Sequence, residues 1–443
     1  MKAFVLAVLL AAPVYAQTPS CQFAAGALPA DTLPSGTPHG SQIPINNIVV
    51  LMQENRSFDH YLGQLHFEGK RRSEGEPKNA SNPDPLGGAP IRAFHQTKYC
   101  EVADLDHSWN GTHREWNNGA MDGFTAENVV PQDASGSRTM GFYDRKDLPF
   151  YYALYKKFAT GDRFFCSTLT QTFPNRFYLL AGTSFGHIQN DFGPVVGYNQ
   201  RSIFNLLDEA GVTWRIYNSG LPFAFLFRYV RNRGENIFDI AQYFVDAQAG
   251  TLPQVSFVDP IFVGGGNVEN DEHPPSNIQV GQEFVARVIN ALLASPQWKS
   301  SALFLEYDEH GGYYDHVPPP PACIPDNIPP MLHPGDVPGA FDRYGIRVPS
   351  VVVSPFSRRK FVSHVAHDHT SILRFIETRF DLPALTARDA NADPMLEFFH
   401  FKHPRFRRPP RLPAAVIDAA HAAQCPGPPP GGSPSPAFVD GAD

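Results

Sequence analysis

Hydrophobic and polar positions along the chain predict an alternation of buried strands and amphipathic helices. Short runs rich in Val, Ile and Phe indicate buried strands at residues 47–52, 213–217, 255–258, 302–307 and 348–354. Apolar residues at helical spacing, or apolar stretches between these runs, predict helices at 148–157, 174–181, 202–210, 238–247, 278–293 and 370–379. Strands that alternate with helices indicate an α/β fold, a three-layer sandwich whose central sheet is mainly parallel. In such folds the ligand site lies beyond the carboxyl ends of the strands.

The two ends of the chain differ in composition from the segment between them. Residues 1–16 combine Lys2, a short apolar run and a Val-Tyr-Ala cleavage pattern, which predicts a secretory signal peptide and an extracellular protein. Residues 17–42 are expected to form an irregular lead-in, and residues 409–443 a disordered tail rich in Pro and Gly. The catalytic domain is therefore expected at residues 43–403. No later run approaches the roughly 18 apolar residues of a membrane span.

Composition and cysteine count narrow the class of protein. The 443 residues are 42% hydrophobic, enough for a large core, and a net charge of -8 gives no reason to expect a nucleic-acid partner. In an oxidising compartment some of the five cysteines should pair, and the odd number leaves at least one free or paired between chains. Asn79 and Asn110 lie in possible glycosylation motifs.

Oxygen-bearing side chains follow two of the predicted strands directly. Glu54 and Asn55 come after the first strand, and Asp308 and Glu309 come after the fourth. Two adjacent carboxylates at the end of a buried strand repel each other and lose hydration, and a divalent cation removes that cost. The alternative is that these residues are a polar loop and solvated surface carboxylates.

A hydroxyl group and several histidines complete the candidate chemistry. Thr172 stands two residues before Pro174, where a helix should begin, so its hydroxyl lies in the positive potential of the helix dipole. A metal ion would lower the pKa of this hydroxyl and make it a nucleophile, although a Thr at this place can also be a simple helix cap. His107 and His273 are the leading candidates for contacting phosphate oxygens or protonating a leaving group. Four further histidines are weaker candidates: His316, His364, His367 and His369.

Taken together, these segments resemble the phosphoesterase family of bacterial phospholipases C and related acid phosphatases. The matching stretches are NNIVVLMQENRSFDHYLG at 46–63, DHSW and WNNGAMDGF within 106–124, TFPNRFYLLAGT at 172–183, NDEHPP at 270–275, YDEHGGYYDHVPPP at 307–320 and DHTSILRFIETRF at 368–380. The resemblance implies a fold similar to alkaline phosphatase and sulfatases. It implies one divalent metal ion held by Glu54, Asn55, Thr172, Asp308 and Glu309. It also implies Thr172 as the nucleophile, where acid phosphatase relatives carry Ser, and His107 and His273 around the phosphate.

The expected function is that of a secreted metal-dependent phosphoesterase, of phospholipase C type, that hydrolyses a phosphate ester through a threonine nucleophile. The expected partner is a phospholipid or a small phosphate ester. An acid phosphatase acting on monoesters is one alternative, and a non-catalytic phosphate- or lipid-binding secreted protein is another. Oxygen-rich ligation favours Ca, Mg or Mn, and a nearby histidine admits Zn. The sequence does not determine the oligomeric state.

Overall fold

A mainly parallel sheet of eight strands forms the centre of the computed structural model, which describes residues 20–262 and 266–425. The predicted signal peptide lies outside these residues. The strand order across the sheet is β12 (Val362–Ser363), β6 (Ala159–Gly161), β11 (Ser350–Val353), β10 (Ser301–Tyr307), β1 (Asn47–Gln53), β9 (Val255–Asp259), β7 (Trp214–Asn218) and β8 (Ile237–Asp239). All five predicted strands are present within one or two residues at each end.

The direction of each strand shows which ends meet. β1 pairs in parallel with both β10 and β9, and β7 pairs in parallel with β9 and β8. The strand predicted at 348–354 forms as β11 but runs antiparallel to both β10 and β6. Gln53 at the end of β1 lies opposite Tyr307 at the end of β10. The residues that follow these two strands therefore emerge side by side.

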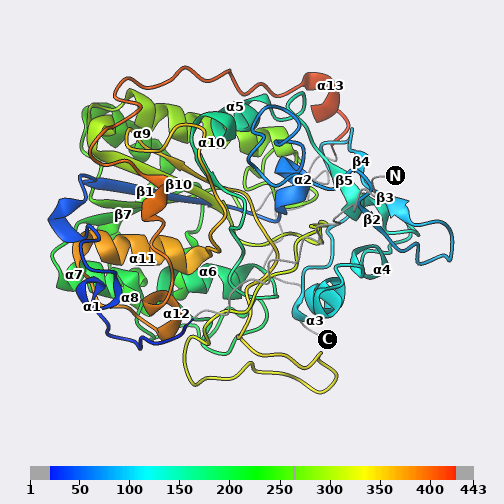
Figure 1. Cartoon of the computed structure of the whole chain (residues 1–443), viewed down its shortest axis with the longest axis horizontal. Helices are drawn as coiled ribbons and strands as arrows, with labels where there is room; N and C mark the ends of the chain where they lie inside the picture. The colour runs from blue at the N-terminus through cyan, green and yellow to red at the C-terminus, as the bar shows by residue number, and fades with distance from the viewer. Residues whose placement is uncertain (1–19, 263–265, 426–443) are drawn as a thin grey trace, which may run out of the picture.

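Helices cover both faces of the sheet, so the predicted three-layer architecture is confirmed (Figure 1). One layer contains α5 (Pro149–Lys157), α9 (Ile240–Ala249) and α10 (Ile278–Ala294), and the other contains α6 (Thr172–Ala181), α7 (Ile203–Glu209) and α11 (His369–Phe380). The apolar side of α10 explains its position, because Val285, Val288 and Ile289 are completely buried. All seven residues of β1 are also buried, as expected for a central strand with helices on both faces.

The carboxyl ends of the parallel strands face a region of loops and short elements, on the right of Figure 1. The elements here are α2 (Phe58–Leu62), α3 (Trp109–Trp116), α4 (Phe124–Glu127) and two small sheets, β2 (Ser81–Asn82) with β3 (Ile91–Arg92) and β4 (Phe94–His95) with β5 (Gly141–Phe142). Elsewhere lie the short helices α1 (Pro29–Thr32), α8 (Arg228–Arg231), α12 (Ala387–Ala390) and α13 (Ala419–Ala422). None of the described helices is long and apolar enough to cross a membrane.

Two disulfides join the terminal segments to the rest of the protein. Cys21 pairs with Cys323 and Cys100 pairs with Cys425, while Cys166 is buried and free. Residues 409–425, part of the segment for which the sequence predicts disorder, cross the α5, α9 and α10 layer along the upper edge of Figure 1. They end at the Cys100–Cys425 disulfide, and on the way Leu412 packs against the core.

Candidate active site

The ends of β1 and β10 bring the four predicted oxygen-bearing residues together. The backbone N–H of Asn55 donates to Oδ1 of Asp308 at 3.2 Å, and the backbone N–H of Arg56 donates to the carbonyl of Glu309 at 3.0 Å. Asn55 has a φ of 59°, so the chain turns sharply as it leaves the strand. A Cβ at Gly311 would come within 2.3 Å of the Asn55 carbonyl oxygen, so only glycine fits beside this turn.

Two oxygens of this group have the properties of metal ligands. Oδ1 of Asn55 and Oε1 of Glu309 are buried and have no hydrogen-bond partner among the described residues. Buried polar atoms are normally paired, so such atoms mark a place for an ion or another ligand. Burial raises the pKa of Asp308 to about 7. The negative charges of Glu54 and Glu309 add to this rise, and the positive charge of Arg176 opposes it. A hard divalent cation would fit this site because its charge would offset the repulsion between these carboxylates.

Arg176 is a part of the site that the sequence analysis missed. Its guanidinium lies between two of the carboxylates, with Nη2 at 3.0 Å from Oε1 of Glu54 and Nε at 3.1 Å from Oδ2 of Asp308. It also stacks over the ring of Phe262 at 4.8 Å from the ring centre. The sequence did contain a signal for Arg176. It follows Thr172 by four positions, and residues four apart on a helix lie on the same face.

Thr172 is the first residue of α6. The residue at the N-cap position is Gln171, and no side-chain hydrogen bond caps the helix. The interpretation of Thr172 as a simple helix cap therefore has no support in the geometry. Asn175 fixes the loop before the helix, because its Nδ2 donates to the Thr170 carbonyl at 2.7 Å and its Oδ1 accepts from the Thr168 N–H at 3.0 Å.

His107 and His273 lie together, with ring centres 5.8 Å apart. His107 Nδ1 contacts the Leu105 carbonyl at 2.7 Å, which leaves Nε2 facing the site at 3.4 Å from Nδ2 of Asn55 and 4.0 Å from Oε1 of Glu309. Both rings also approach Asp104, which the sequence analysis did not select. Burial alone would lower the pKa of His107, but Glu309 and Asp104 raise it to about 10.

Asp104, His107 and His273 offer three ligand atoms within 4.8 Å of one another, so they form a second group that could hold a metal ion. Burial would lower the pKa of His273 too, but Asp104 and Glu54 raise it. Both imidazoles are therefore suited to donate an N–H to an anionic oxygen.

A pocket joins the nucleophile candidate to these groups. Thr172, Glu54 and His273 line it together, with walls formed by Phe173, Asn190, Phe223, Phe262 and Glu269. Glu54 and His273 line the same pocket although they lie more than 200 positions apart in the chain. Glu54 belongs to the four oxygen-bearing residues at the ends of β1 and β10, Glu54, Asn55, Asp308 and Glu309, which we call the strand-end group.

The weaker histidine candidates have structural partners. His316 pairs with Asp59, His364 with Asp162, and His367 with Asp393 and Glu397, all outside the strand-end group. His369 is the exception, since Nε2 lies 2.8 Å from the Asp308 carbonyl and Nδ1 lies 2.8 Å from Glu306. His310 is also close: it contacts Oε2 of Glu309 at 3.2 Å and Glu115 at 2.7 Å. These two histidines position the end of β10.

Several known proteins are similar to this chain. Residues 45–383 match the Phosphoesterase family. Phospholipase C B of Mycobacterium tuberculosis is 34% identical over 445 residues, with 86% of this chain and 84% of that protein covered. Non-specific phospholipase C1 of Arabidopsis thaliana is 34% identical over 416 residues, with 86% and 76% covered. Among solved structures, a protein in the alkaline phosphatase superfamily from Vibrio parahaemolyticus has a TM-score of 0.41 at 9% identity, over 86% of this chain and 74% of that one.

These sequence relationships define the class: the protein is a hydrolase that acts on phosphate esters. The chain belongs to the Phosphoesterase family.

Proposed function

We propose that this protein is a secreted, metal-dependent phosphoesterase of phospholipase C type in which Thr172 is the nucleophile. The observation that carries the proposal is the convergence of Glu54, the Asp308–Glu309 pair and the Thr172 hydroxyl at one edge of the sheet. The relatives named phospholipase C support a phospholipid as the substrate.

The proposed metal ligands are Glu54, Asn55, Asp308, Glu309 and Thr172. The buried, unpaired oxygens of Asn55 and Glu309 fit a divalent cation. When bound, such an ion supplies Lewis-acid stabilisation of phosphate oxygens and lowers the pKa of a coordinated hydroxyl. Oxygen ligation suits Ca, Mg or Mn, whereas His107 and His273 would admit Zn.

The protein's own residues account for the remaining steps. Thr172 Oγ1 gives up its proton to water and attacks phosphorus in line, forming a bond to the phosphoryl group as the bond to the leaving alcohol breaks. The departing alkoxide takes a proton from water to become the alcohol, so the proton lost by Thr172 is balanced. Water then attacks the phosphothreonine, which releases the phosphate product and restores the hydroxyl. His107 and His273 donate N–H groups to the non-bridging oxygens, and the N-terminal end of α6 adds its positive dipole potential.

Several features support export. Two disulfides are typical of oxidising compartments. Of the glycosylation motifs at Asn79 and Asn110, Asn79 is exposed, whereas the Asn110 amide already bonds Asp336 and Val337. Asn79 is therefore the better acceptor.

A substrate panel with metal depletion tests the function. The panel contains phosphatidylcholine, phosphatidylglycerol and a soluble aryl phosphate monoester. We expect diacylglycerol release from a phospholipid, its loss after chelation and its return when Ca, Mg, Mn or Zn is added back singly. Turnover of the monoester alone would support the acid phosphatase alternative. Binding of lipid or phosphate without turnover under any metal would support the non-catalytic alternative.

A further inference from the structure

Exposed apolar side chains gather on two loops beside the candidate active site. One loop contains Phe192 at 41% exposure, Val195 at 94% and Val196 at 58%. The other contains Ile324 at 54%, Ile328 at 40%, Met331 at 43% and Leu332 at 40%. Figure 1 shows the second loop, in yellow, projecting from the body of the protein at the lower edge. We refer to residues 192–196 and 324–332 together as the apolar rim. Exposed apolar clusters of this kind mark surfaces that bind a partner or a membrane.

The projecting loop is hydrogen-bonded to the segment that leads into the first loop. The backbone N–H of Met331 donates to the Gly186 carbonyl at 2.9 Å, and the Thr183 hydroxyl donates to Asp326 at 2.6 Å. Residues 183–186 form the start of the segment that continues into residues 192–196. The projecting loop is therefore attached to the same stretch of chain that carries residues 192–196.

The rim borders the segment of Thr172 directly, and the chain that follows the rim contacts the segment of His107. The ring of Phe192 contacts that of Phe173, the neighbour of Thr172, with ring centres 5.4 Å apart. On the other side, the chain that returns from residue 332 is bound to α3, where the Trp109 Nε1–H donates to the Val337 carbonyl at 2.8 Å. α3 begins just after His107. A surface that covers the rim would therefore lie against the entrance to the site.

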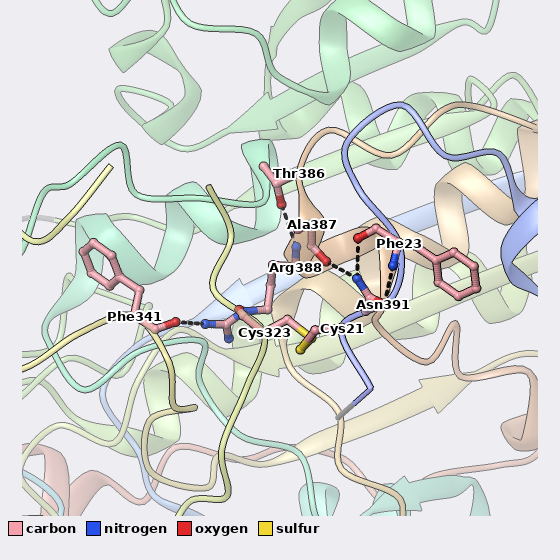
Figure 2. Close-up of a disulfide and its surroundings, with 8 residues drawn as sticks. All are labelled: Cys21, Phe23, Cys323, Phe341, Thr386, Ala387, Arg388 and Asn391. Carbon is pink, nitrogen blue, oxygen red and sulfur yellow. Dashed lines mark hydrogen bonds between the residues drawn. A yellow bond between two sulfur atoms is a disulfide. The ribbon is translucent and has the colours of Figure 1, made fainter. Parts of the chain in front are cut away.

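The projecting loop is fastened at its base, as Figure 2 shows. Cys323, at its beginning, forms the disulfide with Cys21, and the Arg388 guanidinium donates to the carbonyl of Cys323. The same guanidinium donates at 2.7 Å to the carbonyl of Phe341, at the other end of the loop, and at 3.1 Å to that of Ser167. Both ends are held by one buried arginine, so little conformational entropy is lost when the loop binds a partner.

Charge indicates which partner fits. Segments 183–200 and 324–340 contain no Lys or Arg of their own, and their acidic residues are Asp191, Asp326 and Asp336. The exposed Arg231 lies against the rim, because its guanidinium donates to the Val195 carbonyl. Apolar side chains outnumber these charged groups, so apolar insertion is the main contribution of the surface to binding. A second copy of the chain seated on the rim would cover the entrance beside Thr172.

We propose that the apolar rim inserts into the surface of a phospholipid layer, with the pocket of Thr172 facing the head groups. This inference rests on the proposed phospholipase function and adds how the enzyme reaches its substrate. A neutral, zwitterionic surface is sufficient for docking.

Flotation of the full-length protein with phosphatidylcholine vesicles tests the proposal. The test variants are Met331→Ser with Leu332→Ser, and Val195→Ser with Val196→Ser. The matched control is Val245→Ser with Val416→Ser, which removes two exposed valines outside the rim. We expect wild type and control to bind in both low and high salt, and each rim variant to partition about tenfold more weakly, because each loses buried apolar area at the interface. The ratio of vesicle turnover to soluble aryl phosphate turnover should fall in parallel.

Three outcomes would overturn the proposal: rim variants that bind like wild type, binding that requires anionic lipid and disappears in high salt, or a wild-type dimer that the rim substitutions dissociate in sedimentation velocity. Flotation does not depend on turnover. A wild type that floats but hydrolyses no ester would refute the proposed function and leave the docking inference standing.

Discussion

At the scale of single residues, the site divides into positions that the sequence predicts and positions that only the fold reveals. Glu54, Asn55, Asp308 and Glu309 were predictable because each directly follows a buried strand, and parallel strands bring such residues to one edge. Arg176 was missed because its role depends on the direction in which one face of α6 points. Asp104 lies in an irregular segment, where no periodic pattern indicates which way a side chain faces.

Thr172, the proposed nucleophile, is the residue whose role can be tested most directly. Thr172→Val keeps the branched shape but removes the hydroxyl, so we expect kcat to fall by about a thousandfold or more while the fold is retained. Thr172→Ser keeps a hydroxyl and should retain measurable activity. Turnover is measured on the best substrate of the panel, with circular dichroism to check folding. Thr97→Val, at an exposed position, is the matched control. Wild-type turnover by Thr172→Val would exclude the proposed role.

At the scale of elements, long and strongly patterned segments were predictable and short ones were not. The six predicted helices all form, but α6 begins at Thr172, two residues before the predicted start. β6, β8 and β12 have only three, three and two residues, too few for a hydrophobic pattern to develop. The antiparallel direction of β11 could not be predicted either. Its residues form a continuous buried apolar run, and such a run is equally compatible with a parallel and an antiparallel strand.

The segment just before α11 contains a pH-sensitive contact. Burial alone would lower the pKa of His367, but hydrogen bonds to Asp393 and Glu397 raise it to about 10. Because the pKa of His367 is higher in the folded state than the ordinary 6.5, protonation of this side chain stabilises the fold. The stabilisation is fully present below pH 6.5 and is lost as the pH rises towards 10. We therefore expect His367→Gln to be less stable than wild type at pH 6, with a difference that shrinks by pH 10. Urea unfolding across this range measures it, with His403→Gln as the exposed control. A constant difference at all pH values would contradict the assignment.

At the scale of the whole molecule, the terminal segments stabilise the fold through the disulfides. Cys100 and Cys425 are separated by 325 residues, so their bond restricts the unfolded chain strongly. Replacing both by Ala should lower the free energy of unfolding by about 2–5 kcal/mol. It should also expose residues 409–425 to limited proteolysis. Cys166→Ala, which breaks no disulfide, should leave that segment protected. Equal protease resistance in the two variants would show that noncovalent packing alone holds the segment.

The long reach of both disulfides also constrains how the protein can be made. Cys21 cannot form its native bond until Cys323 has been synthesised, 302 residues later. Cys100 likewise needs Cys425, which follows it by 325 residues. Until the ribosome has passed residue 323, the nascent chain contains only Cys21, Cys100 and Cys166, and any bond among these three is a wrong one. Oxidation during translation therefore yields mispaired chains that need a disulfide isomerase. A host strain that supplies one should give a higher yield of native enzyme.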